Sequence, residues 1–121
     1  MKFALIHNRT NLSVEPIKAR MCSSFFCRLR GLMFTRSIGK HEGLLMVQAR
    51  ADRFDSSIHM LFMAYDLAVI WFDDQYRVVD VKLCRQWRPA YIPAAPARFV
   101  LETNVERASD FKIGDELAVQ L

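Results

Sequence analysis

The stretch from residue 67 to residue 84, Leu67-Ala68-Val69-Ile70-Trp71-Phe72-Asp73-Asp74-Gln75-Tyr76-Arg77-Val78-Val79-Asp80-Val81-Lys82-Leu83-Cys84, decides the fold class. Its first part, Leu67–Asp73, is a short apolar run, which is typical of a central strand covered on both faces. Its last part, Tyr76–Cys84, alternates with period two. The alternation places Val79, Val81 and Leu83 on one face and Asp80 and Lys82 on the other. The polar residues 73–75 form the turn between two predicted strands.

Similar patterns recur on both sides of this stretch. The upstream strands are predicted over Phe3–Ile6, Leu12–Val14, Gly43–Val47 and Ser57–Met63, the first two of them as an opening hairpin. The downstream strands are Arg98–Thr103, with Phe99 and Leu101 inward, and a closing strand through Leu117, Val119 and Leu121. Strands so closely spaced, without a βαβ rhythm, predict a mainly β fold. We expect a small antiparallel sandwich or open barrel with one or two short helices.

The two short helices have recognisable ends. Ser23 or Ser24 offers an N-cap to the first helix. Its apolar face is predicted from Phe25, Leu29 and Leu32, at i, i+4 and i+7, and Gly31 lies near its end. The second helical turn is predicted over Val105–Phe111 with Asn104 as its cap.

The composition is that of a globular protein with one core. The chain has 121 residues, 52% of them hydrophobic and 25% charged, which excludes wholesale disorder and a fibrous fold. We find no linker or internal repeat and expect a single domain, 1–121. The apolar run Phe3–Ile6 is shorter than a secretory signal requires. No apolar run approaches the ~20 residues that span a bilayer. The sequence therefore predicts a soluble, cytoplasmic protein.

The three cysteines, Cys22, Cys27 and Cys84, are too few and too unevenly spaced for a disulfide scaffold. We expect reduced thiols, with Cys27 a small buried residue among Phe25, Phe26 and Leu29. A zinc site would need a fourth ligand and a tighter spacing. The sequence indicates no metal and no cofactor.

The charge is concentrated in the first half of the chain. The net charge is +4, yet residues 1–60 hold 10 basic and 4 acidic residues. The run between Glu15 and Glu42 contains only basic charged residues, namely Lys18, Arg20, Arg28, Arg30, Arg36 and Lys40. We interpret this run as a solvated surface paired with acids of the second half. The alternative is weak nucleic-acid binding through the basic N-terminal half.

The most distinctive polar stretch is the proline-rich loop after Cys84. It contains Arg85, Trp87, Arg88 and Tyr91, followed by Pro93 and Pro96. Arginine grips carboxylates and phosphates in bidentate fashion, and tryptophan or tyrosine stacks on rings. The competing interpretation is that Trp87 closes the end of the barrel while the arginines pair with Glu102 or Asp80.

His59 is the one histidine inside a predicted strand. It suits acid–base work in principle, but no nucleophile or orienting acid stands nearby in the sequence, which favours a structural role. At the same end of neighbouring strands, His59 and Glu102 are expected to complete a rim beside the Trp87 loop.

Several short motifs, taken together and in order, resemble a widespread prokaryotic family of domains of unknown function. The first is Arg30-Gly31-Leu32-Met33-Phe34, which looks like the family's RGLMF signature. The others are Gly43-Leu44-Leu45, Ser57–Met63, Val69–Asp73, Trp87-Arg88-Pro89, Val100-Leu101-Glu102 and Ile113-Gly114-Asp115. The resemblance implies a compact, mainly β domain and no assigned activity. Ala68 departs from it, because an Asp is expected there. We expect the Arg30–Phe34 motif to be a helix end docked into the core, with Leu32 or Phe34 buried.

These observations favour a domain that binds a small anionic or carbohydrate-like ligand, or a protein partner, without catalysis. The predicted ligand-binding residues are Arg85, Trp87, Arg88, Tyr91, His59 and Glu102. The alternatives are an enzyme of unknown class that uses His59 with Arg88 or Glu102, and the nucleic-acid module above. The sequence does not indicate the ligand or the oligomeric state.

Overall fold

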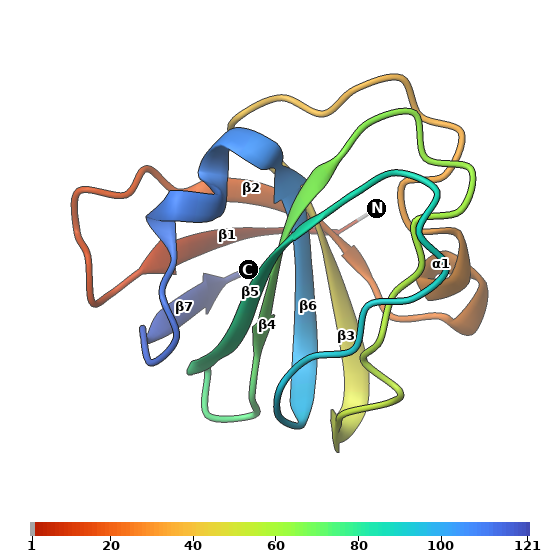
Figure 1. Cartoon of the computed structure of the whole chain (residues 1–121). Helices are drawn as coiled ribbons and strands as arrows, with labels where there is room; N and C mark the ends of the chain where they lie inside the picture. Colours follow the sequence, from red (N-terminus) through yellow and green to blue (C-terminus); the bar gives the residue numbers. More distant parts are fainter. Residues whose placement is uncertain (1) are drawn as a thin grey trace.

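The computed structural model describes residues 2–121 as one seven-stranded sheet in the order β5-β4-β6-β3-β2-β1-β7, curled into a half-barrel (Figure 1). The elements are β1 (Phe3–Asn8), β2 (Ile17–Cys22), α1 (Phe25–Arg30), β3 (Glu42–Asp52), β4 (Leu67–Phe72), β5 (Val78–Cys84), β6 (Ala97–Asn104), the 3-10 helix η1 (Val105–Asp110) and β7 (Leu117–Gln120). The predicted mainly β fold with two short helices is confirmed, in its open-barrel form.

All strand pairs are antiparallel except β2 with β3, which run parallel. A parallel pair needs a long crossover connection, and residues 23–41, which include α1, supply it. The two sheet edges approach each other at one corner. There Val78 N–H donates to the Asp115 carbonyl at 2.8 Å, and Leu117 N–H donates to the Tyr76 carbonyl at 2.8 Å.

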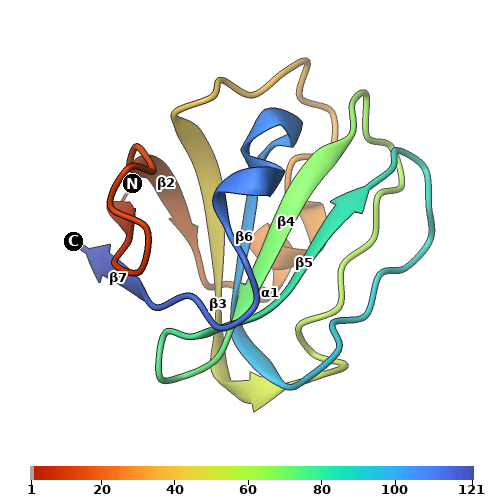
Figure 2. The same ribbon diagram turned by 60° about the vertical axis from the view of Figure 1, so that its left-hand side comes forward.

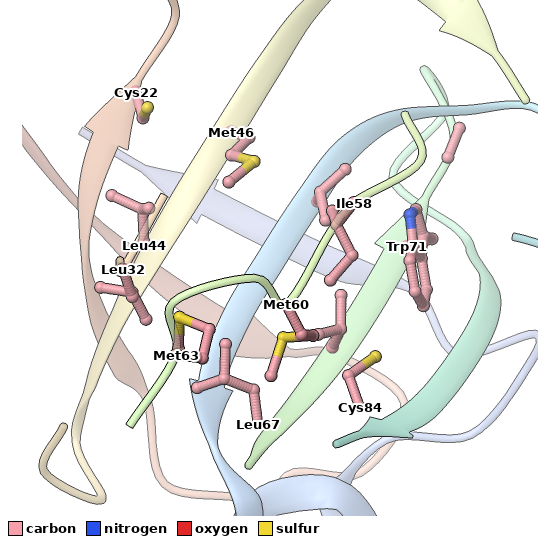
Figure 3. Packing of buried hydrophobic residues seen from close by; sticks show 13 residues of the cluster. Cys22, Leu32, Leu44, Met46, Ile58, Met60, Met63, Leu67, Trp71 and Cys84 are labelled. Atoms are coloured by element: carbon pink, nitrogen blue, oxygen red, sulfur yellow. The ribbon is translucent and has the colours of Figure 1, made fainter. Parts of the chain in front are cut away.

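Apolar side chains bury both faces of the central strands. Every residue of β4 is buried, as the unbroken apolar run predicts. One cluster includes Ile6, Ile70, Phe72 and Leu101. The other includes Met46, Met60, Met63 and Trp71, and is shown in Figure 3. Figures 1 and 2 show α1 and the long loops on one side of the sheet, where they cover the second cluster.

Some predicted strands are placed differently. The partner of β1 is Ile17–Cys22, not Leu12–Val14. The segment Ser57–Met63 is not a strand, since only Ile58 forms a bridge, with Tyr91 of the proline-rich loop. Ile58, Met60 and Met63 are buried, although the segment is a loop held against the proline-rich loop. The pattern of a strand does not distinguish this arrangement.

The two faces of β5 are as predicted for Asp80 and Lys82 against Val81 and Leu83, because the register with β4 alternates over these residues. Exposure does not follow polarity, however, since Asp80 is 6% exposed and Leu83 is 57% exposed. Strand β5 is the edge of the sheet, and the pairing with β4 shifts register between Trp71 and Phe72. Asp80 accepts a hydrogen bond from Ala94 N–H at 2.9 Å and pairs with Lys82 at 3.2 Å. Its carboxylate therefore fastens the proline-rich loop to the sheet.

The predicted caps of the two helices are observed, whereas the predicted apolar face of α1 is not. Ser24 caps α1 by accepting from Cys27 N–H at 3.1 Å, and Asn104 caps η1 by accepting from Glu106 N–H at 2.9 Å. No residue of α1 is buried, however, so Phe25 and Leu29 do not form the expected core face. Only Leu32, just beyond the helix, is buried.

Cys22 and Cys27 form a disulfide, so the prediction of reduced thiols is wrong for this pair. The chain reverses between the end of β2 and the first turn of α1, which brings the two Cα atoms to 5.6 Å, a distance that a disulfide spans. Cys27 is half-buried rather than fully buried. Cys84 is free and buried, and burial raises the pKa of its thiol to about 12.

Candidate functional site

Two loops, residues 57–63 and 85–91, are joined by backbone hydrogen bonds at the end of the sheet where β5 finishes. Trp87 N–H donates to the Met60 carbonyl at 2.7 Å, and Met60 N–H donates to the Arg88 carbonyl at 2.8 Å. Ile58 and Tyr91 exchange two further bonds, of 3.0 and 2.8 Å. The loop that carries Trp87 is therefore held in place by the segment that carries His59.

Side-chain hydrogen bonds also hold the 85–91 loop in place. The Tyr91 hydroxyl accepts a hydrogen bond from Arg85 N–H at 2.8 Å, and the Asp66 carboxylate accepts one from Gln86 N–H at 2.9 Å. Tyr91 therefore positions the loop with its hydroxyl. A loop fixed in this way loses little entropy when a ligand binds to it.

Three aromatic side chains form a continuous ridge on this surface. The ring of Phe62 lies 5.5 Å from that of Phe34 and 5.1 Å from that of Trp87. Phe34, Phe62 and Trp87 are 69%, 47% and 56% exposed. We call these three residues the aromatic ridge. An exposed cluster of large rings is unusual on a soluble domain and is a common sign of a binding surface.

The backbone under the aromatic ridge is strained. Phe34, Phe62 and Trp87 have φ angles of 64°, 61° and 70°. Within residues 2–121, the only other non-glycine residue with positive φ is Tyr76. Bulky residues rarely adopt this conformation, and each instance costs on the order of 1–3 kcal/mol. Such strain concentrates at functional sites, which makes the aromatic ridge the leading candidate.

Arg85 and Arg88 flank Trp87 in the chain, and both are exposed. Neither arginine forms an ion pair within residues 2–121. The suggested pairing with Asp80 or Glu102 is wrong, because Asp80 pairs with Lys82 and Glu102 pairs with no arginine. The barrel-closing role of Trp87 is not observed either, because its side chain is largely exposed.

Glu102 lies on β6 and is 3% exposed. Its Oε1 atom has no hydrogen-bond partner within the described residues. Burial raises the pKa of the Glu102 carboxyl to about 8, because a charged carboxylate is poorly solvated there. At neutral pH Glu102 is therefore mostly an un-ionised acid that can donate a hydrogen bond.

A narrow crevice leads to Glu102. It is lined by the segment 28–32, by Ile58, His59 and Met63, and by Met46 and Glu102. Gly31 forms one wall with a φ angle of 52°, and a β-carbon there would lie 3.2 Å from Glu102 Oε1. The absence of a side chain at Gly31 therefore keeps space open over the acid.

His59 lines the same crevice, so the structure brings His59 and Glu102 together, but Glu102 is buried and does not form the predicted rim beside the Trp87 loop. Its Nε2 lies 2.7 Å from the Leu29 carbonyl, and its Nδ1 accepts from Leu61 N–H at 3.2 Å. These two contacts define the neutral tautomer with the proton on Nε2. Both ring nitrogens are occupied in tying α1 to the 57–63 loop.

The aromatic ridge contains two residues that the site prediction missed. The sequence pattern predicts Phe62 in a strand, and it offers Phe34 as one of two alternatives for the buried anchor of the Arg30–Phe34 motif. Leu32 is the buried anchor, as the prediction allowed. The proximity of Phe34, Phe62 and Trp87 depends on three separate segments, and no local pattern signals it.

Within residues 2–121, no helix is both long enough and apolar enough to cross a membrane. The fold and site define a small half-barrel domain with an exposed aromatic ridge and a buried acid beside it. Residues 6–120 match the model of the family DUF192, described as "Uncharacterized ACR, COG1430", and the chain belongs to this family. The resemblance to an uncharacterised prokaryotic family is thereby confirmed. That Arg30–Phe34 is its signature stays a prediction.

The chain is similar to two archaeal proteins described as UPF0127 proteins. A UPF0127 protein of Thermococcus gammatolerans is 38% identical over 113 residues, which cover 92% of this chain and 72% of that protein. A UPF0127 protein of Pyrococcus horikoshii is 37% identical over 98 residues, 81% of each chain.

Two crystal structures share the fold. A protein of unknown function from Novosphingobium aromaticivorans has a TM-score of 0.84 at 19% identity and covers 96% of this chain and 83% of its own. A Sinorhizobium meliloti protein described as "a putative transcription regulator" has a TM-score of 0.83 at 14% identity, covering 97% and 92%. At these identities the likeness concerns the fold alone.

Proposed function

We propose that this protein binds a small carbohydrate-like, anionic ligand on the aromatic ridge, with Arg85 and Arg88 as the groups that hold its negative charge. The observation that carries the proposal is the contact of three exposed aromatic rings in strained backbone conformations. Sugar rings present apolar C–H faces that pack on aromatic side chains.

The charge around the aromatic ridge supports an acidic sugar over a neutral one. Arg85 and Arg88 lie within two residues of Trp87, and neither is used in an internal ion pair within residues 2–121. A guanidinium binds a carboxylate through two parallel hydrogen bonds. A uronate offers both a ring for the aromatic ridge and a carboxylate for an arginine.

Tryptophan fluorescence tests the proposal, because Trp87 is exposed whereas Trp71 is fully buried. D-glucuronate should change the emission of Trp87 saturably, and it should bind more tightly than D-glucose or inorganic phosphate. Trp87→Ala should abolish the change. Arg88→Lys should weaken binding roughly tenfold, since lysine does not reproduce the bidentate fork, with almost no change in melting temperature.

The matched control is Arg77→Lys. Arg77 is an exposed arginine just before β5, whereas Arg85 and Arg88 follow the other end of this strand, and Arg77 pairs with Glu116 at 3.4 Å. This variant should bind glucuronate as the wild type does. If glucuronate produces no saturable change at constant ionic strength, the proposal is wrong.

The alternative of an acid–base enzyme built on His59 is less well supported. Arg88 does not line the crevice that contains His59 and Glu102. The ring nitrogens of His59 are both engaged with backbone groups, so proton uptake at Nδ1 would break the contact with Leu61.

A further inference from the structure

The crevice over Glu102 and the aromatic ridge are built from the same two segments. Residues 28–34 supply one wall of the crevice and Phe34, and residues 58–63 supply another wall and Phe62. Phe62 precedes the crevice residue Met63 directly in the chain. A ligand that packs on Phe62 therefore lies next to a segment that forms a wall of the crevice.

One polar atom that lines the crevice lacks a hydrogen-bond partner within the described residues. Glu102 Oε1 is buried and without a partner within residues 2–121, and Gly31 and Met46 are among the residues that line the crevice with it. A buried polar atom left unpaired costs roughly 1–3 kcal/mol. A group that supplies the missing hydrogen bond is therefore favoured there.

The size of the crevice limits that group. Its free volume is about 10 Å³, which holds about one water molecule. A hydroxyl or carbonyl oxygen fits this space, whereas a sugar ring or a phosphate group does not.

We propose that Glu102 is a recognition residue of the ligand site, whose buried carboxyl hydrogen-bonds one neutral oxygen of a saccharide packed on the aromatic ridge. This inference rests on the proposed function and narrows it. The ligand is a sugar with a free hydroxyl or carbonyl oxygen at its edge, and a simple inorganic anion does not satisfy the site.

The charged and titratable groups around Glu102 are few. Arg28 and Arg30 come from α1 and its end, and His59 comes from the 57–63 loop. Cys84 of β5 and Tyr65 also interact with Glu102, and burial raises the pKa of each above its ordinary value. The variant Glu102→Gln keeps the shape of the side chain and a hydrogen-bond donor but does not ionise. A pH response of binding that is lost in this variant therefore belongs to Glu102 and not to the other titratable groups.

The test is D-glucuronate binding to wild type and Glu102→Gln at pH 6.5 and pH 9, by Trp87 fluorescence. Ionisation replaces the donor by an unpaired charge, so wild-type affinity should fall about tenfold at the higher pH. Glu102→Gln should change less than about twofold. An equal response of both proteins would overturn the inference and leave the proposed function standing. Wild type that binds no glucuronate at pH 6.5 would overturn both.

A second measurement needs no variant. With ¹³C-labelled methionine methyl groups, glucuronate should shift the signals of Met46 and Met63, which line the crevice. Met60 is fully buried and does not line it, so its signal should stay in place. Binding that leaves Met46 and Met63 unchanged would place the ligand outside the crevice and overturn the inference.

Discussion

At the scale of single residues, Glu102 shows how burial alone changes the chemistry of a side chain. It lies in the middle of β6 among apolar neighbours, and desolvation raises its pKa to about 8. The unfolded chain presents the same carboxyl to water, where its ordinary pKa is 4.5. Folding therefore binds a proton at neutral pH, and stability depends on pH through this one group.

The sign of that dependence is definite. Below about pH 4.5 the carboxyl is protonated in both states, so its contribution to stability is fully present. Between about pH 4.5 and 8 only the folded state keeps the proton, and the free energy of unfolding falls by about 1.4 kcal/mol per pH unit. Above that window the loss is complete.

Urea unfolding of wild type and Glu102→Gln at pH 5, 6.5 and 8 checks this expectation. In the difference between the unfolding free energies of the two proteins, the contributions of the other titrating groups cancel. This difference should shift in favour of Glu102→Gln as the pH rises. A constant difference would mean that Glu102 is ionised in the folded protein.

At the scale of elements, α1 is attached to the molecule by its ends and not by an apolar face. Ser24 caps it, the Cys22–Cys27 disulfide joins its first turn to β2, and the Leu29 carbonyl contacts His59. The helix ends at Gly31, after which Leu32 enters the core. Within the Arg30–Phe34 motif, Gly31 therefore ends the helix and Leu32 packs in the core, whereas Phe34 lies on the surface.

The two large apolar residues of this motif should therefore respond differently to truncation. Leu32→Ala should cost about 2–5 kcal/mol of unfolding free energy, as is typical for a buried leucine. Phe34→Ala should cost less than about 1 kcal/mol, because the ring is 69% exposed. Urea melts of both variants at one pH check the order, and a larger loss from Phe34→Ala would show that Phe34 is part of the core.

At the scale of the whole molecule, the basic residues of the first half are spread over several elements, and some of them pair with other side chains. Lys18 and Arg20 lie on β2 and Arg28 on α1, so the basic run spans more than one element. Lys40 pairs with Glu106 at 3.1 Å, and Arg28 donates a hydrogen bond to Gln48. The pairing of Lys40 with an acid of the second half agrees with the interpretation as a solvated surface.

For nucleic acid, this distribution predicts only weak, nonspecific attraction. We expect no submicromolar binding to short single- or double-stranded oligonucleotides in about 150 mM salt, because phosphate contacts weaken steeply as salt rises. Fluorescence anisotropy with labelled oligonucleotides at low and physiological salt measures this. Tight binding that persists at the higher salt would instead favour the nucleic-acid module.

The sequence by itself determined the features that depend on near neighbours in the chain. The apolar run of β4, the inward Phe99 and Leu101 of β6, and the caps Ser24 and Asn104 are all predictable, because strand burial and helix capping follow from local composition. The irregular, proline-rich nature of the loop after Cys84 is predictable for the same reason.

Only the tertiary structure decided the site. Phe34, Phe62 and Trp87 meet because three separate loops converge, each with a backbone conformation that bulky residues rarely adopt. Glu102 is an un-ionised acid because the neighbours that desolvate it come from distant segments. Long-range contacts of this kind, like the packing of 57–63 under the proline-rich loop, leave no periodicity in the sequence, since they depend on where the chain returns in space.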